Sequence, residues 1–117
     1  MPWTVLIVDD HAGFRRAARA LLEAEGYVVV AESATGGEAL EAADRVQPAL
    51  VLLDIGLPDI DGIRVAALLT AAERGLTVVL TSSHDAADYQ PLLDGCGARG
   101  FIPKAELSGA ALAALAA

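Results

Sequence analysis

The amino-acid sequence predicts an α/β fold in which one parallel sheet carries helices on both faces. Apolar, β-branched runs alternate with helix-patterned segments five times along the chain, and strict alternation of this kind is typical of such folds. Three of the apolar runs are nearly continuous, as expected for strands that are covered on both faces. The chain has 117 residues, the usual size of one domain, so we expect residues 1–117 to form a single domain.

The expected strands are five short runs rich in valine, leucine and isoleucine. In chain order they span Trp3–Val8, Tyr27–Ala31, Leu50–Leu53, Leu76–Thr81 and Gly100–Ile102. The first, third and fourth are the nearly continuous runs, which indicates burial on both faces. Because each strand is followed by a helical segment, the connections are expected to be right-handed crossovers between parallel strands.

Five segments with helical spacing follow the five strands. They span about Phe14–Glu25, Thr35–Arg45, Gly62–Arg74, Asp85–Leu93 and Glu106–Ala116. Thr35 and Glu38 have the spacing of a capping box, which places the start of the second helix. Glycine and proline residues, among them Gly26, Pro48 and Gly75, separate the helices from the strands.

Composition and charge exclude several classes of protein. Apolar residues make up 55% of the chain, which excludes a disordered segment, and the net charge of −8 argues against direct nucleic-acid binding. No apolar run approaches the roughly 18–20 residues of a membrane span, and Asp9 and Asp10 interrupt the first apolar segment. Neither a membrane segment nor a secretory signal is therefore expected. Cys96 is the only cysteine, which fits a reducing environment, so we expect a cytoplasmic protein.

Polar side chains follow four of the five expected strands. Asp9 and Asp10 follow the first strand, Asp54 the third and Lys104 the fifth, while Thr81, Ser82 and Ser83 end the fourth. Ligands of open parallel sheets bind beyond the carboxyl ends of the strands. We therefore expect three carboxylates, a hydroxyl group and an ammonium group to converge on one crevice.

The charges of these side chains predict a divalent cation. Three carboxylates and one lysine leave about two negative charges uncompensated, and two carboxylates about 4 Å apart repel by roughly 4 kcal/mol. Oxygen ligands without histidine or cysteine favour Mg²⁺, with Mn²⁺ as the alternative ion. Mg²⁺ readily shares a phosphate oxygen, and Lys104, the only lysine of the chain, suits another. The predicted chemistry is phosphoryl transfer onto a carboxylate.

Four motifs in these segments resemble a two-component response-regulator receiver domain over essentially the whole chain. The motifs are Val8-Asp9-Asp10, Asp54-Ile-Gly-Leu-Pro58-Asp-Ile-Asp61-Gly62, Leu80-Thr-Ser-Ser-His-Asp85 and Gly97-Ala-Arg-Gly-Phe-Ile-Pro-Lys104. The resemblance implies a flavodoxin-like, doubly wound five-stranded sheet of strand order 2-1-3-4-5 with five helices. The Asp-Asp-His and Phe-Arg opening is most similar to receivers of regulators that carry a helix-turn-helix output domain.

The resemblance implies a role for each matching residue. Asp54 is expected to be the phosphoacceptor, which takes a phosphoryl group from a phosphohistidine of a sensor histidine kinase. Asp10, Asp54 and the backbone carbonyl of Gly56 would bind Mg²⁺ directly, and Asp9 largely through metal-bound water. Lys104 would pair with Asp54 at rest and with a phosphoryl oxygen afterwards.

The resemblance also implies a conformational switch formed by a hydroxyl group and an aromatic ring. Ser82 is the expected switch hydroxyl, because its spacing to Lys104 and to the following His-Asp pair both select it. Thr81 and Ser83 remain the alternatives, and strand alternation points these two the same way and Ser82 the other. Phe101 takes the place of the switch aromatic residue.

Two further positions are expected to set the lifetime of the phosphoryl group. His84 lies two residues past Ser82 and Gly56 two past Asp54, where both would border the path of the hydrolytic water. His11 and His84 are expected to tune access to the crevice rather than to bind metal. The protein would then be a signalling receiver that catalyses only its own phosphorylation and slow dephosphorylation, not an enzyme in the metabolic sense.

Other functions remain as alternatives. The chain is expected to be either a stand-alone receiver or part of a DNA-binding transcriptional regulator. A different alternative is a pseudo-receiver, an interaction module that never takes phosphate. An aspartate-nucleophile phosphatase needs a second aspartate two residues after Asp54, where Gly56 stands. Receivers often pair through the fourth helix, fifth strand and fifth helix, so a homodimer through that face is one expected assembly.

The first helix and the loop after Asp54 carry further charged residues. Three arginines are expected to form a solvated face of the first helix: Arg15, Arg16 and Arg19. The alternative is a kinase-docking patch with Phe14 as its apolar anchor. Arg19 and Glu23 have the spacing of an ion pair across one helical turn. Asp59 and Asp61 are expected to cap the third helix.

Overall fold

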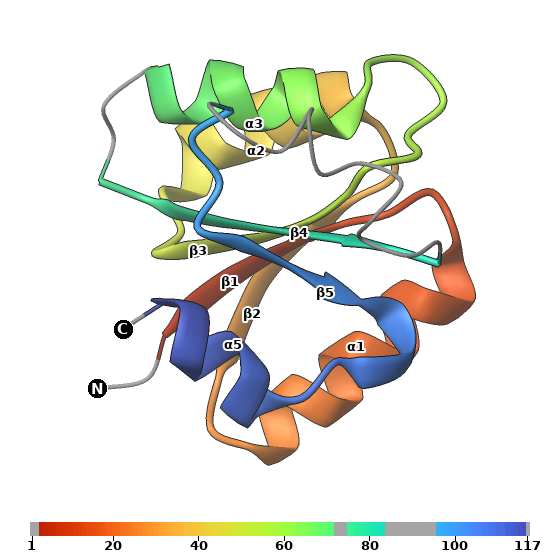
Figure 1. Ribbon diagram of the computed structural model, residues 1–117, viewed down its shortest axis with the longest axis vertical. Coiled ribbons are helices and arrows are strands. Elements are labelled where there is room, and N and C mark those ends of the chain that lie inside the picture. Colours follow the sequence, from red (N-terminus) through yellow and green to blue (C-terminus); the bar gives the residue numbers. More distant parts are fainter. Residues whose placement is uncertain (1–2, 72–74, 84–95, 117) are drawn as a thin grey trace.

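The computed structural model describes residues 3–71, 75–83 and 96–116, which contain a five-stranded parallel sheet (Figure 1). The strands are β1 (Thr4–Val8), β2 (Val28–Ser33), β3 (Leu50–Asp54), β4 (Thr77–Ser82) and β5 (Gly100–Pro103). Their order is β2-β1-β3-β4-β5, which confirms the expected flavodoxin-like topology. Each expected strand is present, and its ends differ from the expected ones by at most two residues.

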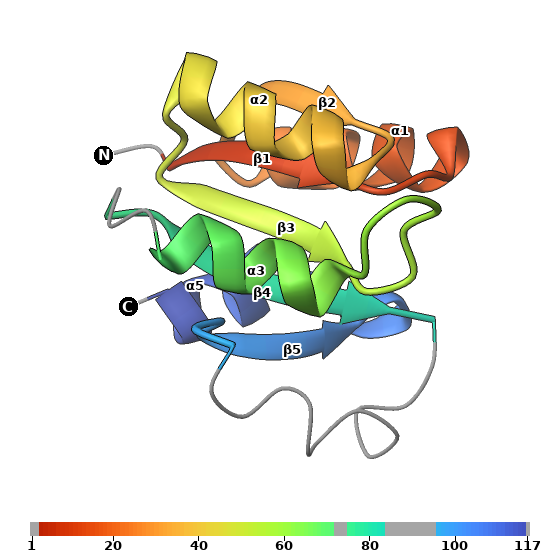
Figure 2. The same ribbon diagram turned by 90° about the horizontal axis from the view of Figure 1, so that it is seen from above.

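Helices cover both faces of this sheet (Figures 1 and 2). They are α1 (Ala12–Ala24), α2 (Gly36–Val46), α3 (Gly62–Ala71) and α5 (Gly109–Ala116), with a short 3₁₀ turn η2 (Lys104–Glu106). α1 and α5 lie on one face, and α2 and α3 on the other. Thr35 caps α2 as expected, since its Oγ1 accepts a hydrogen bond from the Glu38 N–H at 3.1 Å. The expected fourth helix, Asp85–Leu93, lies outside the described residues, and part of the expected dimer face lies there with it.

The last helix begins three residues later than expected. Residues Lys104–Glu106 form η2, and α5 starts only at Gly109. The Oγ of Ser108 accepts a hydrogen bond from the backbone N–H of Ala111 at 3.0 Å, so Ser108 satisfies one of the otherwise unpaired donors of the first turn. The serine cap, rather than the beginning of the alanine-rich pattern, marks the start of this helix.

β2 continues two residues beyond its expected end. Glu32 and Ser33 pair with Ile7 and Val8 of β1, and the Ser33 carbonyl accepts a hydrogen bond from the Asp9 N–H at 3.0 Å. β2 is an edge strand with a partly exposed outer side, so the apolar pattern stops before the strand does. Through this hydrogen bond, the end of the edge strand β2 contacts the turn after β1 that contains Asp9 and Asp10.

The sheet separates two apolar cores. Alternate residues of β1 and β3 point to opposite faces, as the pleat of a strand requires. Leu6, Val8, Val51 and Leu53 face α2 and α3, whereas Val5, Ile7, Leu50 and Leu52 face α1 and α5, and all eight are fully buried. Because both central strands are held from both sides, the turns at their carboxyl ends project from a rigid base.

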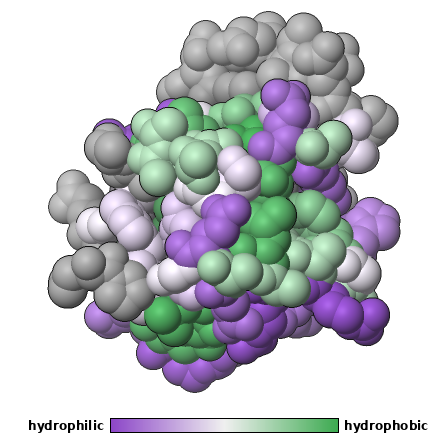
Figure 3. Space-filling view, turned by 90° about the horizontal axis from the view of Figure 1, so that it is seen from below, coloured by the Kyte–Doolittle hydropathy of each residue, from purple (hydrophilic) through white to green (hydrophobic). Residues whose placement is uncertain are grey.

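The outer surface on the side of α1 and α5 carries hydrophilic and hydrophobic residues interspersed (Figure 3). α5 itself consists of glycine, alanine and leucine only. Within the described ranges, no helix combines the length and apolar character that a membrane span requires.

Asp59 caps a different helix from the one expected. Its two carboxylate oxygens accept hydrogen bonds from the backbone N–H groups of Gly36 at 2.7 Å and Gly37 at 3.0 Å, in the first turn of α2. Asp61 caps α3 as expected, since its Oδ1 accepts a hydrogen bond from the Ile63 N–H at 2.8 Å. Sequence spacing alone does not show the Asp59 contact, because it depends on how α2 and α3 pack side by side.

Replacing Asp59 with asparagine is expected to lower the melting temperature at neutral pH. The N–H groups of Gly37 and Gly36 lower the pKa of Asp59, so its carboxylate stabilises the fold above the unfolded pKa of about 3.9 and loses that effect as the pH falls through the folded pKa. The difference between Asp59→Asn and the unsubstituted protein should therefore shrink in thermal unfolding toward strongly acidic pH. Glu41→Gln, on the exposed side of α2, is the control. A difference of equal size at all pH values would contradict the assignment.

Candidate functional site

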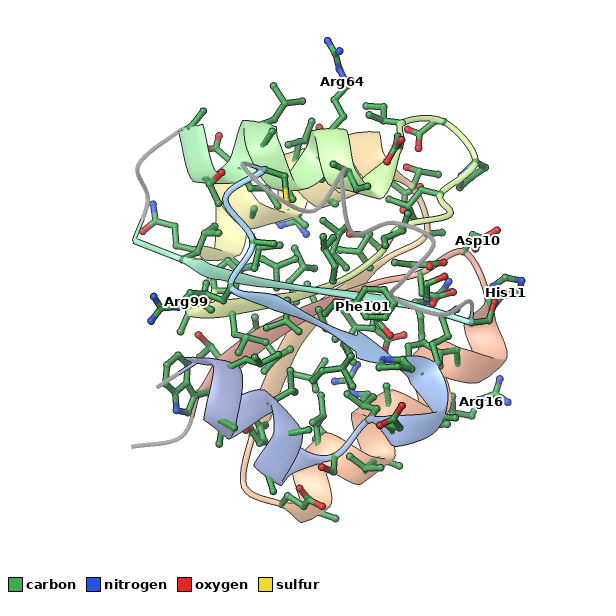
Figure 4. All side chains as sticks on the ribbon, in the orientation of Figure 1. Asp10, His11, Arg16, Arg64, Arg99 and Phe101 are labelled. Carbon is green, nitrogen blue, oxygen red and sulfur yellow. The ribbon has the colours of Figure 1, made fainter. Side chains whose placement is uncertain are left out.

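The carboxyl ends of β1, β3 and β5 bring four charged residues together. The Nζ of Lys104 lies 2.6 Å from Asp9 Oδ2 and 3.6 Å from Asp54 Oδ2. Asp10 lies beside Asp9 at the start of the turn into α1, next to His11 (Figure 4). These are the residues that the sequence placed at strand ends, and the strand order is the reason that they meet.

Asp9 is the most constrained carboxylate of the site. Its side chain is fully buried, and Oδ1 accepts a hydrogen bond from the His11 N–H at 2.8 Å and lies 3.1 Å from His11 Nδ1. Its carbonyl oxygen accepts a hydrogen bond from Arg15 Nη1 at 2.6 Å. Both the backbone and the side chain of Asp9 are thus held in place by the first turn of α1.

Asp54 lies at the end of β3 with its side chain nearly buried, 6% exposed. Burial raises the pKa of Asp54, and the charge of Asp9 raises it further. The charge of Lys104 and the N–H of Gly56, which donates to Asp54 Oδ1 at 3.2 Å, act in the opposite direction. Burial and the neighbouring carboxylates therefore outweigh the opposing effects of Lys104 and Gly56 on the pKa of Asp54.

The Lys104 ammonium group is closer to Asp9 than to Asp54, whereas the family resemblance implied a pair with Asp54. The expected Lys104–Asp54 ion pair is present at 3.6 Å, but the shorter contact, 2.6 Å, is made to Asp9. The Oδ1 atoms of both carboxylates accept a backbone hydrogen bond, Asp54 from Gly56 and Asp9 from His11. The ammonium group of Lys104 faces the Oδ2 atoms of both.

The geometry fits a hard divalent cation. One ligand atom from each of Asp9, Asp10, His11 and Asp54 lies within 4.8 Å of the others. Three of these four atoms are carboxylate oxygens, the donors that Mg²⁺ prefers. His11, which was expected to tune access only, has Nδ1 at 3.1 Å from a carboxylate oxygen of both Asp9 and Asp10, with a side chain 70% exposed.

The hydroxyl groups at the end of β4 lie on neighbouring positions. Thr81 pairs with Asp54 across β3 and β4, is fully buried, and has an Oγ1 with no hydrogen-bond partner in the described structure. Ser82 is the last residue of β4, is also buried, and pairs with Pro103, the residue before Lys104. Ser83 is exposed. The assignment of Ser82 as the switch hydroxyl stays a prediction, with Thr81 and Ser83 as the alternatives.

Three further residues were predicted to have a role. Gly56 is exposed in the turn directly after Asp54. Phe101 is half-buried on β5 and packs against the core on the side of α2 and α3. His84 lies outside the described residues. The roles of Gly56, Phe101 and His84 therefore stay predictions.

The three arginines expected to form a solvated face of α1 do not behave alike, since Arg15 keeps 20% of its side chain exposed and Arg19 43%. Arg15 lies 3.3 Å and Arg19 2.7 Å from the carboxylate of Glu32 on β2, and Arg19 also forms the expected pair with Glu23 at 3.5 Å. Arg16 alone points away from the site into solvent (Figure 4). The late end of β2 explains the difference, because Glu32 belongs to the strand beside α1.

Gly62 is a site residue whose role sequence reasoning missed, although it stands in the quoted Asp61-Gly62 motif. A Cβ atom at Gly62 would lie 2.2 Å from the carbonyl oxygen of Asp54 and 2.6 Å from the Cα of Ile55. The Gly62 N–H donates to the Ile55 carbonyl at 2.9 Å. The start of α3 is therefore pressed against the backbone that carries Asp54, and only a residue without a side chain fits there.

Comparison with known proteins identifies the family. Residues 5–116 match the model of the response regulator receiver domain. A putative transcriptional regulator of Pseudomonas aeruginosa is 42% identical over 102 residues, which are 87% of this chain and 49% of that protein. The transcriptional regulatory protein KdpE of Mycobacterium tuberculosis is 39% identical over 86% of this chain and 43% of its own length. The chain thus spans about half the length of the curated relatives it matches.

Solved structures agree with this assignment. The receiver domain of the putative response regulator NarL from Mycobacterium tuberculosis superposes with a TM-score of 0.86 at 34% identity, covering 97% of this chain and 96% of that one. A LuxR-family two-component response regulator from Aurantimonas gives 0.88 at 30% identity, over 99% of this chain and 86% of its own. The chain belongs to the response regulator receiver domains of two-component systems.

Proposed function

We propose that this receiver domain takes a phosphoryl group onto Asp54 from a phosphohistidine of a sensor histidine kinase, with Mg²⁺ or Mn²⁺ in the acidic pocket. The observation that carries the proposal is the clustering of Asp54 with Asp9, Asp10 and Lys104 at the strand ends. The domain would act in the cytoplasm as a signalling module, and its chemistry would be limited to its own phosphorylation and slow dephosphorylation.

The proposed transfer is a displacement at phosphorus. A carboxylate oxygen of Asp54 forms a bond to the phosphorus atom, the bond from phosphorus to the kinase imidazole nitrogen breaks, and the electron pair stays on that nitrogen. The chain supplies a fixed nucleophile, because the Gly56 N–H and the rigid end of β3 orient the Asp54 carboxylate. Lys104, 3.6 Å from Asp54 Oδ2, is close enough to pair with an oxygen of the incoming group.

Asp9, Asp10, Asp54 and the backbone carbonyl of Gly56 would hold the metal ion. When bound, the ion neutralises the repulsion among the carboxylates and draws a phosphoryl oxygen into the pocket. A related structure supports magnesium as the ion: the CheX–CheY–BeF3–Mg²⁺ complex from Borrelia burgdorferi superposes on this chain with a TM-score of 0.83 at 26% identity.

We further propose that phosphorylation acts through the Ser82 hydroxyl group and Phe101, and that His84 and Gly56 set the lifetime of the phosphoryl group. The output would be transcriptional, because curated relatives such as BvgA of Bordetella pertussis, 38% identical over 102 residues, are named as transcription regulators. This domain would not contact DNA itself, since its net charge is −8.

Incubation with Mg²⁺ and acetyl phosphate, followed by intact mass measurement, tests the proposal. We expect one phosphoryl adduct that is stable in acid, labile in base and absent without divalent cation. Asp54→Ala should lose the adduct, whereas Asp61→Ala, in the same loop but capping α3, should keep it. A pseudo-receiver would show no adduct, and a phosphatase would release phosphate with rapid turnover. Either result would overturn the proposal.

A further inference from the structure

The ammonium group of Lys104 has three close neighbours. Two of them are Asp9 Oδ2 and Asp54 Oδ2, at 2.6 Å and 3.6 Å. The third is the ring of Phe14, whose centroid lies 4.6 Å from Nζ. The Lys104 side chain is only 15% exposed, so the ring takes a place where water would otherwise solvate the charge.

An aromatic ring at this place attracts the cation, which an aliphatic side chain would not do. The face of a benzene ring carries partial negative charge, and a cation within about 6 Å of the centroid is attracted to it, more strongly when water is excluded. Phe14 is half-buried and packs against the core on the side of α1 and α5. Its position is set by the first turn of α1, which follows directly on Asp9 and Asp10.

We propose that Phe14 is a positioning residue for Lys104. Its ring holds the ammonium group against the carboxylates of Asp9 and Asp54, so that the charge is already in place when a phosphoryl group reaches Asp54. The inference rests on the proposed function of Asp54 for its effect on rate, but the contact itself is independent of phosphorylation. The Phe14 ring acts through Lys104 and touches no reacting atom.

Lys104 is the only lysine of the chain, so lysine labelled with ¹³C reports on this one side chain in an NMR spectrum. In the metal-free protein, the ring current of Phe14 should shift the Lys104 ε-methylene protons from their ordinary position. Phe14→Leu removes the ring but keeps an apolar side chain, and the shift should disappear. Phe14→Tyr keeps the ring, and the shift should persist.

The same variants are then phosphorylated with acetyl phosphate and saturating Mg²⁺. In this reaction the Asp54 oxygen bonds to phosphorus, the bond from phosphorus to the bridging oxygen breaks, and acetate leaves with the electron pair. Phe14→Leu is expected to lower the rate about 3- to 30-fold, the span from an exposed to a desolvated cation–π contact. Phe14→Tyr should stay within about twofold of the unsubstituted rate. Because acetyl phosphate is the phosphoryl donor, an effect of Phe14 on kinase docking cannot change the measured rate.

Leu21→Ala is the matched control, because Leu21 lies on the same helix and packs against the same core. It should lower the melting temperature and leave both the Lys104 signal and the rate unchanged. An unshifted Lys104 signal in the unsubstituted protein, or equal losses of rate in Phe14→Leu, Phe14→Tyr and Leu21→Ala, would overturn the proposal. If no variant takes phosphate while the ring-current pattern is as expected, the proposed function of Asp54 fails and the positioning contact stands.

Discussion

Replacing Lys104 with methionine is expected to lower the free energy of unfolding of the metal-free protein by about 3–5 kcal/mol, the usual cost of removing one partner from a buried ion pair. The substitution leaves the fully buried Asp9 and the nearly buried Asp54 without a cation, while methionine retains the apolar length of the side chain. Urea unfolding in the presence of EDTA measures the loss. Saturating Mg²⁺ should restore most of it, because a bound cation replaces the missing positive charge.

The loss should depend on pH in a defined direction. The pKa of Asp54 is raised in the folded protein, and removing Lys104 takes away a charge that lowers it. A carboxyl group with a raised pKa binds its proton more tightly in the folded than in the unfolded chain, so the stability of Lys104→Met should rise as the pH falls from neutral toward the unfolded pKa of about 3.9. Asp54→Asn added to Lys104→Met should recover stability at neutral pH for the same reason.

The control for this experiment is Arg64→Met. Arg64 is an exposed cation on α3 that points away from the site (Figure 4), and its removal should change stability by no more than about 0.5 kcal/mol. A Lys104→Met variant as stable as Arg64→Met in EDTA would mean that the carboxylates are compensated by something other than Lys104.

Replacing Gly62 with alanine is expected to cost about 1–3 kcal/mol of stability, the range for inserting a methyl group into a filled space, and to impair phosphorylation of Asp54. The new Cβ would lie 2.2 Å from the Asp54 carbonyl oxygen, so the backbone of Asp54 or the start of α3 has to move. Alanine favours helices over glycine by about 1 kcal/mol, but this gain does not relieve a clash with backbone. Urea unfolding and intact mass after acetyl phosphate treatment measure the two effects.

Gly13→Ala is the matched control for Gly62→Ala. Gly13 also lies in the first turn of a helix beside the site, but a Cβ atom there would meet no atom within 4 Å. The substitution should leave stability unchanged or raise it by up to about 1 kcal/mol through the higher helix propensity of alanine. If Gly62→Ala behaves like Gly13→Ala, the close approach of α3 to Asp54 is not what requires glycine at this position.

Much of this fold could be predicted because its signals are local. The continuous apolar runs of β1, β3 and β4 mark strands that are buried on both faces, and the alternation with helical segments implies a parallel sheet. The apolar pattern predicts less accurately where the edge strand β2 ends and where α5 begins. β2 ends in the polar pair Glu32 and Ser33, and α5 begins at the cap formed by Ser108, two features that an apolar pattern does not contain.

For the site, the sequence is enough to predict which charged groups meet, because Asp9, Asp10, Asp54 and Lys104 lie at or just after the end of a strand and parallel strands end at one edge. The individual contacts of these groups depend on how the whole fold packs. The contact of Lys104 with Asp9 and with the Phe14 ring, and the approach of Gly62 to Asp54, join segments far apart in the chain or on different elements. Their geometry follows from how the helices pack on the sheet, and packing is a property of the assembled cores that no local pattern of residues contains.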